Sequence, residues 1–225
     1  MKPVLGAVTI GQSPRVDLVP ELMEMLGGNV TIKEAGALDD LTSEQIQQLA
    51  PGPNDYVLVS RLRNGGSAKM AERLVSPLVK QAIKKLYDEG AQVIVLLCTG
   101  EFPPLQIPNG LLVIPQPLIN GIGQALARDS KLGVIRPSSD QIPQATRAWQ
   151  PACKELVVEA ASPYVQGDGI ALAANSLKDA EVDMIIMDCM GYTKAMQEQV
   201  RTITGKPVLL ARSLVARILA ELLNL

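Results

Sequence analysis

The chain contains an approximate internal repeat, and this repeat limits the folds that it can adopt. The clearest match aligns QVIVLLCTG at residues 92–100 with DMIIMDCMG at residues 183–191. Each segment is an apolar run that ends in a cysteine with a glycine close behind. The first half carries an insertion relative to the second. Two similar lobes are the simplest architecture, and three pairs of segments carry the match: 92–100 with 183–191, 112–119 with 208–215, and 5–8 with 132–135.

Short β-branched runs alternate with helical patterns along nearly the whole chain. This order is typical of parallel strands joined by crossover helices, so we expect an α/β fold. The apolar stripe from Leu74 to Leu86 predicts one kinked helix or two helices, because Ser76-Pro77 is a helix-start signal. Ser213 is expected to cap a terminal helix. Strands are expected at residues 4–10, 30–34, 56–60, 93–97, 111–114, 132–135, 155–159, 184–188 and 208–210.

The repeat predicts two parallel-sheet lobes with a cleft between them. We expect an N-terminal lobe of residues 1–115 plus 208–225 and a C-terminal lobe of residues 116–207, since the last element of each repeat can pack on the opposite lobe. Open parallel sheets place their ligand-facing loops at the carboxyl ends of the strands. A small-molecule site is therefore expected at those ends.

The 225 residues include no histidine. This excludes Ser-His-Asp and Cys-His nucleophile pairs, and zinc sites with an imidazole ligand. Acid–base chemistry near neutral pH must use Cys, Asp, Glu, Lys or Tyr side chains whose pKa values are shifted by their surroundings. The sequence also lacks a phosphate-binding P-loop and a complete dinucleotide-binding glycine pattern, and we expect no cofactor and no metal ion.

Charge and composition argue against nucleic-acid and membrane partners. The chain has 21 Lys and Arg against 23 Asp and Glu, and aromatic residues make up only 3% of it, which leaves little to bind phosphates or stack on bases. Its apolar stretches are too short or too charged to cross a bilayer. Three cysteines without a CxxC pattern, and no signal peptide, predict a cytoplasmic protein with free thiols. Homo-oligomers are common among such α/β proteins, and the oligomeric state stays open.

Cys98 and Cys189 occupy equivalent positions in the repeat, each at the end of an apolar strand. A buried cysteine is most often a small hydrophobe, but the paired placement favours two catalytic thiols. Two opposed thiols suit the movement of a proton on a carbon next to a carboxylate, because one acts as base and the other as acid. Asp188 is expected on the opposite face of its strand. Cys153 has no repeat partner, and we expect a structural role for it.

Three loops that follow strands carry groups suited to an anion. Residues 11–15 combine backbone N–H groups with a hydroxyl and a guanidinium before a helix. Their counterpart near residue 138 also has capping-box spacing, and the arginine-bearing loop at residues 60–67 also fits a solvated turn. The loops after the cysteines offer further amides. The candidate substrate-binding residues are Gly11, Gln12, Ser13, Arg15, Arg61, Arg63, Thr99, Gly100, Ser138, Ser139, Gly191, Tyr192 and Thr193.

Together, the two strand-end cysteines, the duplicated lobes and the Ser-Pro pair of the first loop resemble the aspartate/glutamate racemase superfamily. Within it the chain resembles the AroM family over nearly its whole length, most closely at residues 183–192 and 206–223. The superfamily resemblance implies opposed cysteines that exchange a proton at the α-carbon of a small acid. It implies that Cys98 and Cys189 are acid and base.

The same resemblance places Ser13, Thr99 and Ser138 near the ligand. The chain departs from the racemase pattern after its second cysteine, where it has Met190-Gly191-Tyr192 and racemases typically have Thr. The first loop also departs from the racemase pattern. Because these departures fall at the proposed site, the identity of the substrate stays open.

The preferred hypothesis is a cofactor-independent, racemase-like enzyme that acts on a small carboxylic acid with two cysteines. A related enzyme that uses one thiol, for cis-trans isomerisation or decarboxylation, is a second hypothesis. A third is a protein that binds a carboxylate for regulation without turnover. Loss of activity in only one of the two single-cysteine variants favours the second, and thermal stabilisation by a carboxylate without turnover favours the third.

Overall fold

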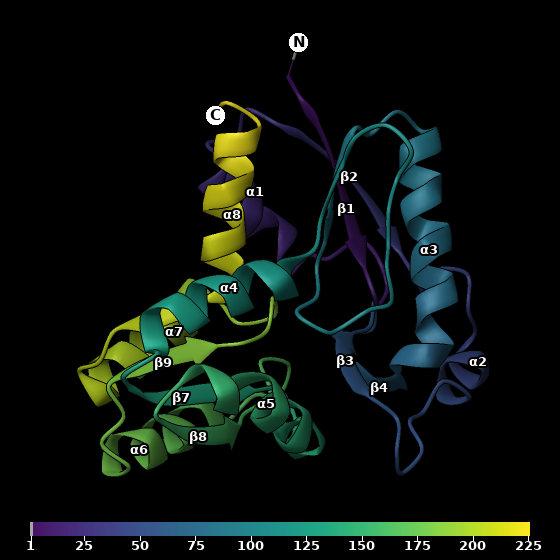
Figure 1. Cartoon of the computed structure of the whole chain (residues 1–225). Helices are drawn as coiled ribbons and strands as arrows, with labels where there is room; N and C mark the ends of the chain where they lie inside the picture. The colour runs from purple at the N-terminus through teal and green to yellow at the C-terminus, as the bar shows by residue number, and fades with distance from the viewer. Residues whose placement is uncertain (1) are drawn as a thin grey trace. The chain divides into compact units, whose positions relative to one another are not determined.

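The computed structural model describes residues 2–225, and the chain divides into two compact units (Figure 1). Unit 1 consists of Met1–Gln116 and Ala216–Leu225, and unit 2 of Pro117–Val215. Each unit contains a four-stranded parallel sheet. The α/β class and the pair of parallel-sheet lobes predicted from the sequence are confirmed.

Unit 1 is built around one parallel sheet and an added hairpin. Its elements are β1 (Val4–Thr9), α1 (Val19–Met25), β2 (Thr31–Gly36), α2 (Ser43–Gln47), β3 (Val57–Arg61), β4 (Ser67–Ala71), α3 (Glu72–Asp88), β5 (Val93–Leu96) and β6 (Leu111–Val113). The sheet order is β2-β1-β5-β6. The amphipathic helix α3 packs on this sheet (Figure 1), and its buried stripe joins the core that also contains Cys98.

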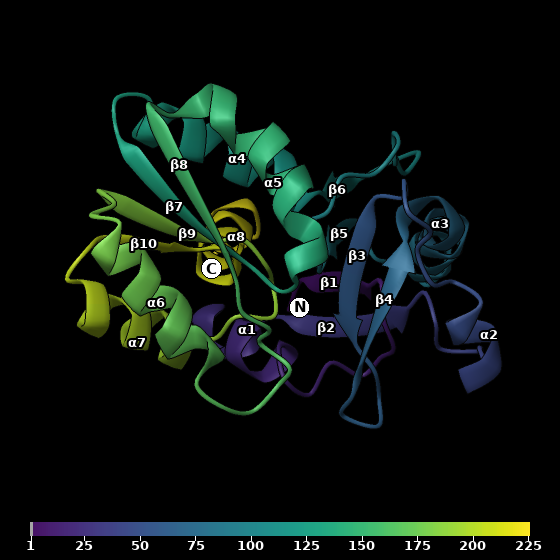
Figure 2. The same cartoon turned by 90° about the horizontal axis from the view of Figure 1, so that it is seen from below.

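Unit 2 repeats this plan. Its elements are α4 (Pro115–Ala127), β7 (Lys131–Arg136), α5 (Ile142–Trp149), β8 (Glu155–Ala160), α6 (Gly169–Asp179), β9 (Met184–Met187), α7 (Lys194–Thr204), β10 (Val208–Leu210) and α8 (Ala211–Leu222). Figure 2 shows α6 and α7 on one face of the sheet and α5 on the other. The core under α6 and α7 contains Cys189.

The strand orders of the two sheets correspond strand by strand. The order β2-β1-β5-β6 in unit 1 matches β8-β7-β9-β10 in unit 2. The duplication inferred from the sequence is therefore present in the topology. The insertion in the first half is α2 with the hairpin β3–β4, which lies between β2 and β5 and has no counterpart between β8 and β9.

Most of the expected strands agree with the structure to within one or two residues, with one omission. The strand β4 was not predicted, and β3 pairs with it in an antiparallel hairpin outside the parallel sheet. The segment Ser67–Ala71 lacks the β-branched run that marks the other strands. The expected loop at residues 60–67 is therefore the end of β3, a tight turn and the start of β4.

The expected lobe boundary at residue 208 lies further along the chain. β10 pairs with β9, so residues 208–210 belong to the sheet of unit 2. The following helix α8 begins in unit 2, and only its residues from Ala216 onward belong to unit 1. The hydrogen bonds of β10 fix this assignment.

One helix prediction is confirmed in one of its two forms, and another needs correction. α3 runs as a single helix from Glu72 to Asp88 with Pro77 inside it, so the two-helix alternative is wrong. Its long buried stripe holds the helix together where proline removes one backbone hydrogen bond. α8 already begins at Ala211, so Ser213 is not its cap. The Ser213 hydroxyl instead donates to the carbonyl oxygen of Leu210.

Candidate active site

Cys98 and Cys189 lie just beyond the carboxyl ends of equivalent strands. β5 ends two residues before Cys98, and β9 ends two residues before Cys189. Both side chains are buried, with the same relative exposure of 9%. In each loop a glycine N–H points at the sulfur: Gly100 N lies 3.2 Å from Cys98 Sγ, and Gly191 N lies 3.3 Å from Cys189 Sγ.

The contact between the glycine N–H and the cysteine sulfur affects the charge state of the thiol. An N–H group that donates to sulfur stabilises the negative charge of a thiolate. A cysteine that only completes an apolar strand does not need such a donor. The structure thus repeats one thiolate-stabilising arrangement, which we call the Cys98 half-site (residues 98–100 with Leu58) and the Cys189 half-site (residues 188–191 with Tyr164).

The inserted hairpin covers the Cys98 half-site with an apolar side chain. A Cβ atom added to Gly100 would overlap Leu58 Cδ2 of β3. A Cβ atom added to Gly11, after β1, would overlap the backbone oxygen of Arg61 on the same strand. The two glycines therefore let β3 approach the loops after β1 and β5. Thr99, in the loop after β5, is buried.

The first candidate anion loop already holds an anion from the protein itself. The backbone N–H and the hydroxyl of Ser13 each donate to the carboxylate of Asp39 at 2.6 Å, and Gly36 N donates to it at 2.7 Å. Arg63 Nη2 lies 3.1 Å from Asp39 Oδ1. The Gln12 side chain accepts from the Arg63 backbone N–H. The donors of this loop thus bind a carboxylate, and that carboxylate belongs to Asp39.

Arg15 is also engaged inside unit 1. Its buried guanidinium makes two 2.9 Å hydrogen bonds to the Asp17 carboxylate and donates to Thr9 Oγ1 at 2.9 Å. Burial raises the pKa of Asp17. The hydrogen bonds and the charge of Arg15, with a smaller effect of Arg61, lower this pKa by more than burial raises it, so the net result is a lowered pKa. Arg15 therefore anchors the loop to the end of β1.

The Cys189 half-site is covered by a tyrosine that the sequence analysis did not single out. The hydroxyl of Tyr164 lies 3.9 Å from Cys189 Sγ. A Cβ atom added to Gly191 would lie only 2.5 Å from the same hydroxyl. Tyr164 is half-buried in the loop between β8 and α6. It lies outside the matching segments of the repeat, so the sequence offered no signal for it.

A buried ion pair stands next to Cys189. Arg136 Nη1 lies 2.6 Å from Asp188 Oδ2, and the indole N–H of Trp149 donates to the same oxygen at 3.0 Å. The contact with Trp149 of α5 places Asp188 on the opposite face from Cys189, which packs in the core under α6 and α7. The alternation predicted from the sequence is therefore present.

Tyr192 and Thr193 support the loop after Cys189. Tyr192 is fully buried, and its hydroxyl donates to the carbonyl oxygen of Ala161 at 2.7 Å. Burial, with a smaller effect of Cys189, raises the pKa of Tyr192 well above its usual value. The Thr193 hydroxyl accepts from Met196 N as the N-cap of α7, which confirms that this loop opens a helix.

The second candidate anion loop does not form the capping box that its spacing indicated. Ser138 makes no side-chain cap, and its hydroxyl donates to Asp140 at 3.3 Å. Gln141 N donates to the carbonyl oxygen of Ser138, because the segment is a short 3-10 turn rather than the start of an α-helix. Ser139 is exposed on this turn.

Arg212 supports the backbone of the Cys189 half-site, and the sequence analysis did not single it out. It is completely buried at the start of α8. Its Nε donates to the Met190 carbonyl oxygen at 2.9 Å, and its Nη2 donates to the Gly191 carbonyl oxygen at 3.1 Å. Its repeat equivalent is Gln116, which is also buried. The available signal was a charged residue two positions after the apolar strand β10, where the other repeat has Gln116.

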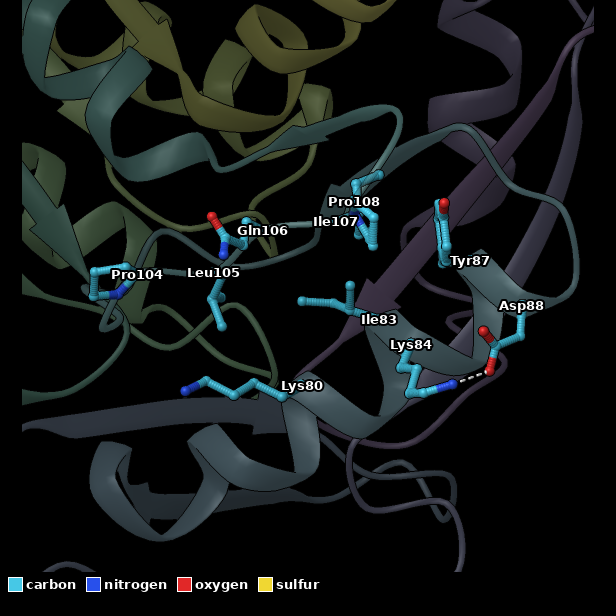
Figure 3. Close-up of a pocket in the computed structure, with 10 residues that line it drawn as sticks. All are labelled: Lys80, Ile83, Lys84, Tyr87, Asp88, Pro104, Leu105, Gln106, Ile107 and Pro108. Carbon is cyan, nitrogen blue, oxygen red and sulfur yellow. Dashed lines mark hydrogen bonds and ion pairs between the residues drawn. The ribbon is translucent and has the colours of Figure 1, made fainter.

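A cavity of about 470 Å³ lies elsewhere in unit 1. Figure 3 shows it between α3 and the segment after the Cys98 half-site, with Ile83, Tyr87, Leu105 and Ile107 among its apolar lining and the Lys84–Asp88 ion pair at its edge. It extends along the half of α3 that leads into the start of β5. Cys98, at the other end of that strand, is not among the lining residues.

Among residues 2–225, none of the helices is long and apolar enough to cross a membrane. Within the same residues, no group of three or more cysteine, aspartate or glutamate side chains is arranged to hold a metal ion. All three cysteines are free thiols.

The fold is that of racemase-like α/β proteins. The chain is similar to glutamate racemase from Thermus thermophilus in complex with β-chloro-D-alanine (16% identity, 99% of this chain and 81% of that chain, TM-score 0.62). It is similar to allantoin racemase from Pseudomonas fluorescens (13%, 98% and 90%, TM-score 0.60). It is also similar to maleate cis-trans isomerase from Nocardia farcinica, a mutant with a covalently bound succinylcysteine intermediate (15%, 99% and 93%, TM-score 0.59).

The sequence itself gives the family. Residues 5–223 match the AroM protein family, and the chain belongs to it. No curated protein matches the chain significantly. At these low identities the solved structures establish the shared fold, and the reaction has to be argued from the two half-sites.

Proposed function

We propose that the chain is a cofactor-independent, racemase- or isomerase-like enzyme that moves a proton on a small carboxylic acid, with Cys98 and Cys189 as acid and base. The observation that carries this proposal is the repeated contact between a glycine N–H and a cysteine sulfur at 3.2 and 3.3 Å. The racemases and the isomerase that share the fold support the reaction class. Free thiols fit a reducing cytoplasm.

In this mechanism one cysteine, as thiolate, removes the proton from the carbon next to the carboxylate. The electron pair of the broken C–H bond is delocalised onto the carboxylate. The other cysteine, as thiol, then gives its proton to the opposite face of that carbon. The carbon is inverted, thiol and thiolate have exchanged, and no oxidant or metal enters the balance. Both sulfurs must reach the same substrate carbon.

We place the recognition of the substrate carboxylate at the segments that follow the cysteines, with Thr99 in unit 1 and Ser138 in unit 2 as hydroxyl contacts. Ser13, Arg15 and Arg63 are bound to carboxylates of unit 1 itself. Their role in this proposal is to shape the loop after β1 rather than to clamp the ligand.

The test is the incorporation of solvent deuterium into a panel of amino and hydroxy acids, followed by mass spectrometry. Cys98→Ser, Cys189→Ser and the double variant are compared with Cys153→Ser, a matched control outside both half-sites. We expect exchange by the wild type and by the control, and none by the double variant. Undiminished exchange in the double variant would falsify the two-thiol mechanism.

A one-thiol isomerase is the second candidate, favoured by the succinylcysteine intermediate in the maleate cis-trans isomerase that shares the fold. It predicts that only one single-cysteine variant loses activity. It also predicts a covalent adduct on that cysteine with an unsaturated acid such as maleate, visible as a mass increase of the intact protein. A protein that only binds carboxylates would show thermal stabilisation by one of the acids without exchange or adduct.

A further inference from the structure

We propose that the two thiols are not equivalent: Cys189 is the thiolate of the resting enzyme, Cys98 is its protonated partner, and Tyr164 is a further catalytic residue that stabilises the charge on Cys189. This inference rests on the proposed function and assigns the roles that it leaves open. It is argued from the side chains around each sulfur, since the backbone contacts are the same.

The first difference is the group that covers each glycine. Over the Cys98 half-site this group is the Leu58 methyl, which cannot donate a hydrogen bond. Over the Cys189 half-site it is the Tyr164 hydroxyl, 3.9 Å from the sulfur. A hydroxyl at this distance donates to sulfur once the sulfur carries charge, and hydrogen bonds to a charged acceptor are the stronger ones. Cys189 thus has a hydroxyl beside it in addition to the glycine N–H, whereas the group over Gly100 in the Cys98 half-site is a methyl.

The second difference lies behind the glycine N–H. The Met190 carbonyl and the Gly191 N–H belong to one peptide group, and the Arg212 guanidinium donates to that carbonyl at 2.9 Å. A cation on the oxygen of a peptide polarises its N–H, because hydrogen bonds in a chain strengthen one another. The matching position in unit 1 is Gln116, which carries no charge. Arg212 is therefore a positioning residue that strengthens the donor to Cys189.

The other titratable groups around Cys189 do not cancel this effect. Asp188 is adjacent in sequence, and its carboxylate forms an ion pair with Arg136 at 2.6 Å. Tyr192 is buried with its hydroxyl donated to a backbone carbonyl, and its raised pKa keeps it neutral. The buried guanidinium of Arg212 donates to two carbonyl oxygens of the same loop.

The test is the pH dependence of alkylation by iodoacetamide, measured for each cysteine of the full chain by peptide mass spectrometry between pH 5.5 and 9.5. Normalising each rate to its own plateau removes differences in access. We expect Cys189 to reach half of its plateau rate about one pH unit or more below Cys98, a shift of the size that local donors produce. Coincident profiles, or the reverse order, would overturn the assignment.

Variants then locate the cause. Tyr164→Phe removes only the hydroxyl, and we expect the normalised rate of Cys189 at pH 6.5 to fall about threefold or more, as loss of a charge-assisted donor implies. Arg212→Lys keeps the charge and loses the fork, and a smaller fall is expected. Tyr56→Phe is the matched control, since its hydroxyl accepts from Glu101 N in unit 1, and it should leave Cys189 unchanged. An unchanged Cys189 profile in folded Tyr164→Phe would overturn the role of the tyrosine.

Alkylation needs no substrate, so this experiment is independent of turnover. A Cys189 profile at lower pH without any deuterium exchange would contradict the proposed function and leave the inequality of the thiols standing. Exchange that depends on both cysteines, together with coincident alkylation profiles, would support the proposed function and overturn the inequality of the thiols. Circular dichroism of each variant establishes that it is folded before its profile is compared.

Discussion

The Cys98 half-site and the Cys189 half-site have the same backbone and different surroundings. Both sulfurs are buried to the same degree and accept from a glycine N–H two residues on. Leu58 covers one glycine, and Tyr164 covers the other. The repeated fold therefore determines where the thiols lie, and a few side chains determine how polar each thiol's environment is.

A second contrast lies one strand away from each cysteine. In unit 2 the buried Arg136–Asp188 pair spans β7 and the end of β9. The aligned positions in unit 1 are Thr9 and Leu97, which carry no charge. There the cation comes from Arg15, whose guanidinium reaches Thr9 from the following loop. Each unit thus has a buried arginine near the end of an equivalent strand. Arg136 is the last residue of β7, and Arg15 lies in the loop after β1.

The largest effect is expected from Arg136→Met, which breaks the ion pair of unit 2. It leaves Asp188 buried with an uncompensated charge, and removal of one partner from a buried pair costs about 3 to 5 kcal/mol. Urea unfolding followed by circular dichroism measures this loss. The matched change in unit 1 is Thr9→Val, which removes the hydroxyl that accepts from Gly11 N and Arg15 Nη1 and should cost less, about 2 kcal/mol. Equal losses in the two variants would contradict the contrast.

The next effect distinguishes the two glycines. Gly191→Ala sets a Cβ atom 2.5 Å from the Tyr164 hydroxyl and 2.9 Å from Pro163, both parts of rigid rings. We expect it to lose about 2 to 3 kcal/mol through overpacking, with slower alkylation of Cys189 at neutral pH. Gly100→Ala meets the end of the flexible Leu58 side chain, which can rotate, and should lose less than about 1 kcal/mol. Thermal unfolding of both variants checks the order, and a larger loss for Gly100→Ala would reverse it.

A smaller effect is expected from the Arg15–Asp17 pair of unit 1. Because the pKa of Asp17 is lowered in the folded state, its carboxylate stabilises the protein above the unfolded value of 3.8, and this contribution is lost as the pH falls through the folded pKa. Asp17→Asn should therefore cost about 1.5 kcal/mol near pH 7 and much less at the acid end. Unfolding curves between pH 7 and pH 3 test this, and a pH-independent difference would contradict it.

The smallest effect tests the role of the loop after β1. Ser13→Ala removes one hydrogen bond to Asp39 and should cost about 1 kcal/mol of stability. If the loop only has a shaping role, the KM of any acid that is turned over should change little. A large rise in KM with unchanged stability would return Ser13 to the ligand and contradict the account given above.

The fold was predictable because its signals are local or repeated. The β-branched runs of β1, β5, β7 and β9 mark buried parallel strands, and the alignment of the two halves predicts two similar lobes. β4 and the antiparallel pairing of β3 were not predictable, because the segment Ser67–Ala71 has no β-branched residue and its partner is set by a tight turn.

The positions of the two cysteines followed from the repeat, but their environments did not. Tyr164 and Arg212 reach the Cys189 half-site from elements far along the chain, and only tertiary packing brings them there. The anion-binding character of residues 11–15 was also predictable from their donors. Its partner was not, because Asp39 belongs to a loop that follows a different strand.

The most direct test of the central claim is to bridge the two sulfurs. Two thiols that act on one carbon must each come within about 3.5 Å of it, which places them within about 7 Å of one another. A short reagent such as 1,3-dibromoacetone, applied to the Cys153→Ser protein, is predicted to join Cys98 to Cys189, seen as one cross-linked pair of peptides. Single modification of both thiols without any joined peptides would contradict a shared substrate carbon.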